Sequence, residues 1–198
     1  MWGQAMDGGL MVTVQGRSGN NSNQPVRIAA FDWDFTLVRP RDGVWSGSSD
    51  HPANWSWLNG SVARVLNDLH AQEYHVVVFS NQASIGRHGF YSRTSILVRQ
   101  RFDAFLRLLS FKAVVVVACH RDSVFRKPGR GMWDYAVSHL RTRVDYGGSF
   151  FVGDCAGRVG DFSDCDIKFA ECIGIRFVTP EDFFIDAEAE AEAEEERT

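Results

Sequence analysis

The sequence changes from apolar to acidic within Ile28-Ala29-Ala30-Phe31-Asp32-Trp33-Asp34-Phe35-Thr36-Leu37. The apolar part has the composition of a buried β-strand. Side chains two positions apart in an extended segment project to the same side, so the carboxylates of Asp32 and Asp34 would meet at the tip of this strand. Two like charges in contact are costly unless a cation lies between them. The stretch therefore predicts a magnesium site with one carboxylate free to attack a substrate, with an ordinary solvated Asp-x-Asp turn as the alternative.

Strand-like and helix-like segments alternate along the rest of the chain. Apolar, β-branched runs predict further strands at residues 75–79, 113–119, 149–152 and 175–178. Apolar residues that recur every three or four positions predict helices at residues 61–70, 92–109 and 132–140 and in a segment ending at Gly174. This alternation is typical of an α/β protein, a three-layer α/β/α sandwich around a central parallel sheet. The ligand crevice of such a sheet lies at the carboxyl ends of its strands.

The pattern fits one domain, residues 26–185, between two segments of different composition. Residues 1–25 are rich in Gly, Ser, Asn and Gln and predict a flexible leader. Residues 186–198 alternate between Ala and Glu, and we interpret them as an acidic solubilising tail or a cloning remnant. Inside the domain, residues 39–57 predict a long loop, and long loops in compact domains tend to be functional.

The negative charge of the chain is concentrated in its last residues. The formal net charge at pH 7 is −4 over 198 residues. Residues 186–198 contain seven acids against Arg197 alone, a local net charge of −6, which leaves +2 for the rest of the chain. A mildly basic body is compatible with a nucleic-acid partner without requiring one.

The cysteines and the absence of a long apolar run indicate the compartment. Cys119, Cys155, Cys165 and Cys172 form no Cys-x-x-Cys pair and follow no secretory leader, so we expect free thiols in a reducing intracellular compartment. The longest apolar run, at residues 113–119, is too short to span a bilayer, and we expect no membrane partner. We place the protein in the nucleus, with a mitochondrial address as the alternative.

Chemically useful side chains follow the ends of four predicted strands: Asp32 and Asp34, Ser80, Lys127, and Asp154. Carboxylates, a hydroxyl and an ammonium group in this combination suit phosphoryl transfer through a covalent aspartyl-phosphate. Asp32 would attack phosphorus, and Asp34 would protonate the departing oxygen and later take a proton from water. Each residue alone also fits an ordinary turn, loop or cap position. The order of all four clusters is what indicates an enzyme.

The same residues predict a cofactor and a phosphate site. Mg²⁺ held by Asp32, Asp154 and the backbone carbonyl of Asp34 would shield the nucleophile from the negative charge of the phosphate. Ser80 and the backbone amide that follows it would hold phosphoryl oxygens. Lys127 would neutralise the charge that develops in the transition state.

The order Asp-x-Asp-x-Thr, Ser, Lys, Gly-Asp resembles that of the haloacid dehalogenase (HAD) superfamily over residues 27–184. Three longer stretches narrow the resemblance: Phe79-Ser80-Asn81-Gln82 with Ile85-Gly86-Arg87, Arg126-Lys127-Pro128 with Gly131-Met132-Trp133, and Val152-Gly153-Asp154-Cys155-Ala156-Gly157-Arg158 with Asp161-Phe162-Ser163. They are similar to the phosphatase domain of polynucleotide kinase 3′-phosphatases. The resemblance implies a HAD-like, Rossmann-type fold, a Mg²⁺-dependent polynucleotide 3′-phosphatase activity on DNA ends, and a role in strand-break repair.

The resemblance also implies substrate contacts and a further acid near the metal. The implied substrate-binding residues are Thr36, Asn81, Gln82, Arg87, Arg126, Arg130 and Arg158. Trp33, Trp55 and Trp133 would offer stacking faces to a DNA strand. The further acid is either Asp161 or Asp166, and we favour Asp161 as a residue close to the metal.

The sequence departs from the family pattern at three points. Phe35 stands where the family usually has glycine, which is expected to shift local geometry more than chemistry. The linker between Arg158 and Asp161 is shorter than usual, which leaves the identity of the further acid open. The sequence contains no Gly-x-x-x-x-Gly-Lys-Ser/Thr phosphate loop, so we expect no 5′-kinase activity. The chain resembles the stand-alone 3′-phosphatase form, and we expect a monomer.

Two other functions remain as alternatives. A small-molecule HAD phosphatase would act on histidinol phosphate or a sugar bisphosphate, but such relatives often carry a cysteine-rich zinc loop ahead of the lysine, where this chain has only Cys119-His120. A catalytically silent DNA-end binding module would have no need of Asp34 as an acid for a leaving group. The partners expected for the favoured function are DNA ends with a 3′-phosphate and other repair proteins.

Overall fold

The computed structural model describes residues 2–5, 9–14, 24–43, 51–140 and 143–184. Its centre is a seven-stranded sheet in the order β1-β2-β7-β6-β3-β8-β9. These strands are β1 (Trp2–Ala5), β2 (Leu10–Val14), β3 (Arg27–Phe31), β6 (Tyr74–Asn81), β7 (Val114–Ala118), β8 (Phe150–Val152) and β9 (Arg176–Val178). Five neighbouring strands, β7, β6, β3, β8 and β9, pair in parallel. β2 pairs antiparallel with β7, and β1 pairs antiparallel with β2 at the edge of the sheet.

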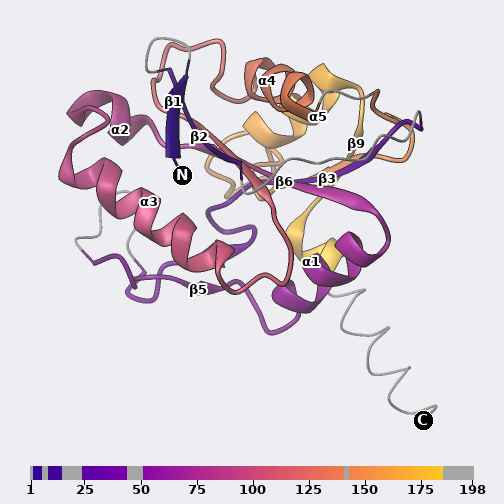
Figure 1. Cartoon of the computed structure of the whole chain (residues 1–198), viewed down its shortest axis with the longest axis horizontal. Coiled ribbons are helices and arrows are strands. Elements are labelled where there is room, and N and C mark those ends of the chain that lie inside the picture. The colour runs from indigo at the N-terminus through magenta and orange to yellow at the C-terminus, as the bar shows by residue number, and fades with distance from the viewer. Residues whose placement is uncertain (1, 6–8, 15–23, 44–50, 141–142, 185–198) are drawn as a thin grey trace.

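Helices cover both faces of the sheet, which confirms the predicted three-layer sandwich (Figure 1). The helices are α1 (Val62–Ala71), α2 (Ala83–His88), α3 (Arg93–Leu106), α4 (Gly131–Leu140) and α5 (Cys165–Ile173). Buried residues of α1 and α3 pack in one hydrophobic cluster with one face of the sheet, and those of α4 and α5 pack in a second cluster with the other face. Within the described part of the chain, no helix combines the length and hydropathy needed to cross a bilayer.

Residues 2–5 and 10–14 form strands, which corrects the prediction of a flexible leader for these residues. Residues 1, 6–8 and 15–23 of the predicted leader lie outside the described residues. In the antiparallel pairing of β2 with β7, Leu10 lies opposite Ala118 and Val14 opposite Val114. Leu10 and Met11 are fully buried, on opposite faces of the sheet. The short apolar run of β2 therefore gains enough burial to extend the sheet, although the composition of the whole segment resembles that of a linker.

Two of the tryptophans that were expected to stack on DNA are core residues, so that expectation is wrong for them. Trp33 is 1% exposed, and its ring centroid lies 4.3 Å from that of Phe102 on α3. Trp133 on α4 is fully buried against Phe79. The apolar layers on each side of the sheet leave no face of these rings for a base. Trp55 is also largely buried but borders a surface groove described below.

The predicted long loop, residues 39–57, starts and ends in a two-stranded sheet of β4 (Val38–Arg39) and β5 (Ser56–Trp57). The side-chain oxygen of Asn54 accepts hydrogen bonds from the backbone N–H groups of Arg41, at 3.1 Å, and Asp42, at 3.2 Å. These bonds close the base of the loop. Residues 44–50, in its middle, lie outside the described residues.

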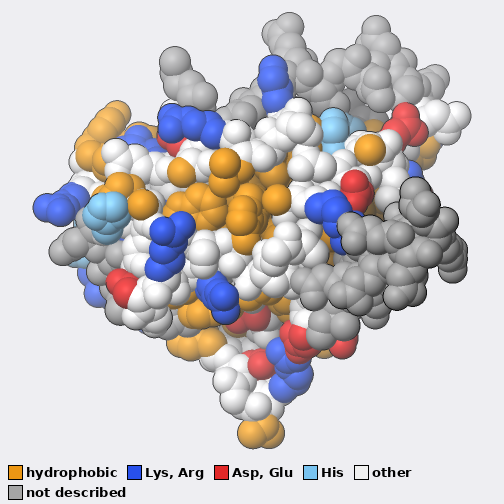
Figure 2. All heavy atoms as spheres, turned by 90° about the horizontal axis from the view of Figure 1, so that it is seen from below, with side chains coloured by type: hydrophobic (Ala, Val, Ile, Leu, Met, Phe, Trp, Pro, Cys, Tyr) orange, Lys and Arg blue, Asp and Glu red, His pale blue; other side chains and the backbone are white. Residues whose placement is uncertain are grey.

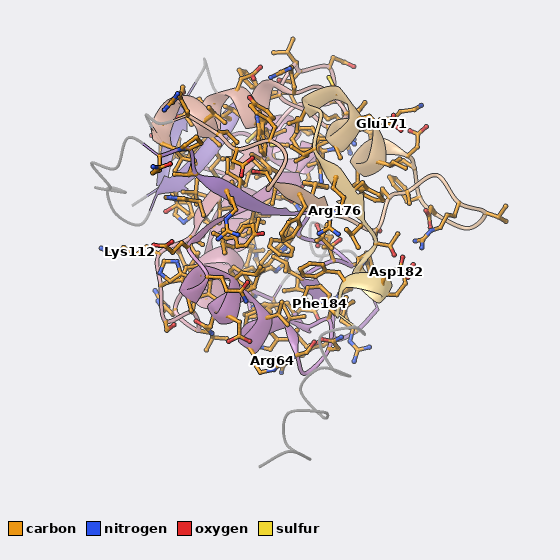
Figure 3. All side chains as sticks on the ribbon, turned by 90° about the vertical axis from the view of Figure 1, so that its right-hand side faces the viewer. Arg64, Lys112, Glu171, Arg176, Asp182 and Phe184 are labelled. Carbon is orange, nitrogen blue, oxygen red and sulfur yellow. The ribbon has the colours of Figure 1, made fainter. Side chains whose placement is uncertain are left out.

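The last described segment, residues 180–184, is a helical turn that closes one side of the core. Figure 3 shows Phe184 directed inwards, whereas Asp182 of the same turn lies at the surface. Phe184 is fully buried and stacks on Phe31 of β3 with ring centroids 6.4 Å apart. The turn therefore supports the strand that carries Asp32. The predicted acidic tail lies outside the described residues and stays a prediction.

Candidate active site

Three carboxylates meet at the carboxyl ends of the central strands. Asp32 follows β3, Asp154 follows the neighbouring strand β8, and Asp166 lies in the first turn of α5. The backbone N–H of Asp32 donates to the carbonyl of Val152 at 2.8 Å, which fixes the tip of β3 against β8. One oxygen from each of Asp32, Asp154 and Asp166 lies within 4.8 Å of the other two. Elements far apart in the sequence thus bring three acids to one point.

Lys127 lies between two of these acids. Its Nζ donates to Asp32 Oδ1 and to Asp166 Oδ1, the latter at 2.7 Å, and its side chain is almost inaccessible to solvent. Asn81, the last residue of β6, positions the loop that carries Lys127. Its side-chain oxygen accepts from Lys127 N at 3.0 Å, and its side-chain nitrogen donates to Lys127 O at 3.2 Å. The ammonium group is therefore held in place by the end of a neighbouring strand.

Asp34 and Ser80 are joined through Gln82. The side-chain nitrogen of Gln82 donates to Asp34 Oδ2 at 2.7 Å and to Ser80 Oγ at 3.0 Å. Thr36 donates to Asp154 Oδ1 at 3.5 Å. The structure thus places Thr36, Ser80 and Gln82 beside the acids, and Gln82 orients the carboxylate that was expected to act as the acid.

Burial controls the protonation of this group. Desolvation raises the pKa of Asp32 well above its ordinary value, in spite of the attraction of Lys127. Desolvation and then the charge of Asp166 raise the pKa of Asp154 to about 6. Burial alone would lower the pKa of Lys127, but the carboxylates of Asp166 and Asp32 outweigh it and raise that pKa, so the ammonium stays charged. When all three carboxylates are ionised, they exceed the single charge of the ammonium, and a divalent cation would balance the excess and favour their ionised forms.

Asp161 does not join this group, which corrects the expectation that it lies close to the metal. Its carboxylate accepts hydrogen bonds from the backbone N–H groups of Ala156 and Arg158, both at 3.0 Å. It also forms an ion pair with the Arg158 side chain. Asp161 therefore builds the turn after Asp154. The structure instead brings Asp166, the alternative that the sequence left open, beside Asp32 and Asp154, because the first turn of α5 packs directly against Gly153.

Comparison with known proteins assigns the chain to a family. The family model described as polynucleotide kinase 3 phosphatase matches residues 27–184. The chain belongs to this family. It is 38% identical over 160 residues to the bifunctional polynucleotide phosphatase/kinase of Schizosaccharomyces pombe, covering 80% of this chain and 38% of that protein. It is 33% identical over 175 residues to the polynucleotide 3′-phosphatase ZDP of Arabidopsis thaliana, covering 82% of this chain and 24% of that protein. The chain thus spans less than half the length of either relative.

Among solved structures, the D,D-heptose 1,7-bisphosphate phosphatase of B. bronchiseptica, complexed with magnesium and phosphate, superposes with a TM-score of 0.58 at 21% identity. The superposition covers 77% of this chain and 79% of that protein. At this identity the likeness shows the shared fold alone.

The arginines expected to bind substrate in this polynucleotide kinase 3 phosphatase domain differ in their surroundings. Arg158 contacts Asp161, Glu181 and the backbone carbonyl of Asp154. Arg130 forms an exposed ion pair with Asp134, four residues later on α4. Acidic side chains of the same chain therefore already neutralise the positive charge of both arginines. Arg87 on α2 is exposed, and Arg126 is half-buried next to Lys127.

A surface groove that no sequence motif indicated lies along β5 and α3 of the family domain. Its lining is mostly apolar but includes one charged residue, and it consists of Arg41, Pro52, Ala53, Trp55, Ser56, Trp57, Gln100, Ala104 and Leu108. Figure 2 views the side of the molecule on which Figure 1 draws β5 and shows a band of hydrophobic side chains flanked by Lys and Arg. Helical spacing could have revealed part of this lining, because Leu108, just beyond the end of α3, follows Ala104 at i+4 within the helix predicted at residues 92–109.

Proposed function

We propose that this chain is a Mg²⁺-dependent polynucleotide 3′-phosphatase that releases phosphate from DNA ends through an aspartyl-phosphate. The observation that carries the proposal is the contact of the buried Lys127 ammonium with both Asp32 and Asp166, beside Asp154. A nucleophilic carboxylate flanked by a fixed positive charge and by further acids suits attack on a phosphomonoester. Membership of the family and the names of both relatives support a polynucleotide 3′-phosphate as substrate.

In the first step, Asp32 attacks phosphorus. A new bond forms between a carboxylate oxygen of Asp32 and phosphorus, while the bond between phosphorus and the 3′-oxygen of the substrate breaks. Asp34, oriented by Gln82, gives its proton to that departing oxygen. Lys127 stabilises the negative charge that accumulates on the phosphoryl oxygens.

In the second step, water attacks the aspartyl-phosphate. Asp34, now deprotonated, takes a proton from the water molecule, and the bond between phosphorus and Asp32 breaks to release inorganic phosphate. The oxygens of Asp32, Asp154 and Asp166 fit a hard cation, and Mg²⁺ held by them would offset the charge of the phosphate as it approaches Asp32.

The reaction is tested with three phosphate donors. A 3′-phosphorylated oligonucleotide, the same oligonucleotide with a 5′-phosphate, and histidinol phosphate are incubated with the chain, with and without Mg²⁺, and phosphate release is measured. We expect release from the 3′-phosphate alone and only with Mg²⁺. Equal or faster turnover of histidinol phosphate would instead indicate a small-molecule phosphatase. Binding of the oligonucleotide without any release would indicate the silent DNA-end binding module.

Two substitutions separate the roles of the acids. Asp32→Asn should abolish turnover of every substrate while the circular dichroism spectrum stays that of the parent chain.

Asp34→Asn should greatly slow the release of a 3′-phosphate but slow the hydrolysis of p-nitrophenyl phosphate much less, because nitrophenolate leaves without a proton. An equal loss on both substrates would contradict the role of Asp34 as the acid.

The proposal also covers the binding partners, the oligomeric state and the cellular location of the protein. We infer that it acts as a monomer on DNA ends, alongside other repair proteins and in the nucleus. The body of the chain outside residues 186–198 carries a net charge of +2, which is compatible with a nucleic-acid partner.

A further inference from the structure

Two cysteines flank the acids of the candidate active site. Cys155 directly follows Asp154, and Cys165 directly precedes Asp166. The Sγ atoms of Cys155 and Cys165 and an oxygen of Asp166 all lie within 4.8 Å of one another. Cys155 Sγ donates to Asp154 Oδ2 at 3.7 Å, and Cys165 Sγ donates to Asp166 Oδ1 at 3.8 Å. The mechanism of phosphate release uses neither thiol.

The backbone holds the two thiols in this arrangement. The N–H groups of Asp166 and Ile167 donate to the carbonyl of Cys155 at 3.1 and 3.3 Å. In return, the N–H of Cys155 donates to Asp166 Oδ2 at 3.1 Å. The turn after β8 and the first turn of α5 are thereby tied together. These bonds fix the backbone on which both cysteines stand, which lowers the entropic cost of binding an ion between them.

The distances match a small tetrahedral metal site. Zinc–thiolate bonds of about 2.3 Å in tetrahedral geometry place two sulfurs about 3.8 Å apart. Cys165 Sγ lies 3.8 Å from Asp166 Oδ1, and the other separations within the cluster are below 4.8 Å. Closure around an ion therefore requires shifts of about 1 Å or less. Thiolate ligands select zinc-like ions over Mg²⁺, whereas the all-oxygen group of Asp32, Asp154 and Asp166 favours Mg²⁺.

We propose that Cys155, Cys165 and Asp166 form a binding site for one thiophilic divalent cation of the Zn²⁺ class, adjacent to the proposed Mg²⁺ site and sharing Asp166 with it. Binding replaces two S–H bonds by two metal–thiolate bonds and releases both protons to solvent. The metal also takes the carboxylate of Asp166, which in its absence accepts from Lys127 at 2.7 Å. Occupation of the site therefore frees Lys127 from one of its two anchors and inhibits the phosphatase reaction, an effect that rests on the proposed function.

Cobalt provides a direct probe of the site, because cobalt–thiolate bonds absorb in the near ultraviolet. The metal-free chain is titrated with Co²⁺ in the presence of excess Mg²⁺ and a phosphine reductant. We expect a thiolate-to-cobalt absorption band that saturates at one Co²⁺ per chain and disappears when Zn²⁺ is added. Cys155→Ser and Cys165→Ser should each lose the band. Cys172→Ser, which alters an exposed free cysteine, is the matched control and should keep it.

A measurement on the unsubstituted chain removes any dependence on how the variants fold. Zn²⁺ should protect Cys155 and Cys165 from alkylation by iodoacetamide, as read by mass spectrometry, and leave Cys172 unprotected. Absence of the band, or equal protection of Cys172, would overturn the proposed site.

The functional consequence is tested separately with a 3′-phosphorylated oligonucleotide at saturating Mg²⁺. Zn²⁺ should inhibit phosphate release by the parent chain and by Cys172→Ser. It should inhibit release by Cys155→Ser and Cys165→Ser much less, each compared with its own rate without Zn²⁺. Equal inhibition of all four proteins would overturn the link to the reaction. If the chain releases no phosphate at all, the proposed function is wrong. The cobalt band then still shows whether Cys155, Cys165 and Asp166 bind a metal ion.

Discussion

At the scale of single residues, Lys127 holds together charges that would otherwise repel one another. Its ammonium contacts Asp32 and Asp166, and all three side chains are nearly excluded from solvent. Lys127→Met keeps much of the apolar stem but leaves buried acids without their counter-charge. Loss of one partner from a buried ion pair costs about 3–5 kcal/mol. We expect a loss of stability of that order in urea denaturation without metal, and at least about a hundredfold lower turnover.

Lys168→Met is the matched control for this substitution. Lys168 pairs with Asp164, four residues earlier at the start of α5, and both side chains are exposed. Solvent screens such a pair, so its loss should leave the denaturation midpoint and the turnover nearly unchanged. A similar loss of stability in both variants would show that the buried contacts of Lys127 contribute no more to stability than the exposed pair of Lys168.

Phe35 occupies a backbone conformation that side chains disfavour. Its φ is 61°, in the left-handed region, at the position where the family pattern usually has glycine. Phe35→Ala and Phe35→Gly both remove the ring, but only glycine also relieves the strain of a Cβ at this φ. We expect the glycine variant to be about 1 kcal/mol more stable than the alanine variant in urea denaturation. An alanine variant of equal or greater stability would contradict this strain.

Most site residues could be predicted from the sequence because they lie at or just beyond the carboxyl ends of apolar strands. Asp32, Asp154 and Ser80 need only the rule that parallel strands present their carboxyl ends at one edge. Asp166 could not be selected over Asp161 on this basis, because the choice depends on how the turn after β8 folds. That turn uses Asp161 for its own backbone N–H groups and brings Asp166 back to Lys127.

At the scale of elements, the sequence predicted the parallel strands and their helices but not the antiparallel edge. Helix α1 has its buried residues Val62, Val65, Leu66 and Leu69 at the predicted spacing. β2, by contrast, is a five-residue strand inside a segment of linker-like composition. Its burial comes from pairing with β7, about a hundred residues later in the sequence. No sequence pattern within β2 itself predicts such a long-range contact.

The close packing of β8 against α5 gives a prediction at the same scale. A Cβ added to Gly153 would lie 2.6 Å from Asp166 Oδ2, closer than real Cβ atoms approach an oxygen. Gly153→Ala should displace Asp166 from Lys127 and reduce phosphate release by about tenfold or more, because small shifts of catalytic groups are costly. Gly60→Ala, where an added Cβ meets nothing within 4 Å, is the control and should keep full activity. Undiminished activity of Gly153→Ala would show that Asp166 tolerates displacement.

At the scale of the whole molecule, the sheet brings several carboxyl groups close together, and the free-energy cost of this arrangement depends on pH. The pKa of Asp154 is raised from 3.8 to about 6, mainly by desolvation. Its folded state therefore binds a proton more tightly than the unfolded chain does. The stability that this proton confers is fully present below about pH 4 and is lost as the pH rises through about 6. Asp32, whose pKa is also raised by burial, adds to the same trend.

We therefore expect the metal-free chain, kept in EDTA, to lose stability in urea denaturation as the pH rises from 4 to 7. Mg²⁺ should restore stability most at the upper end of this range, because it binds the deprotonated carboxylates of the folded state. Asp154→Asn removes one titrating group and should flatten the pH dependence in EDTA and weaken the effect of Mg²⁺. An unchanged slope in that variant would mean that the acids at the strand ends do not control the stability of the fold.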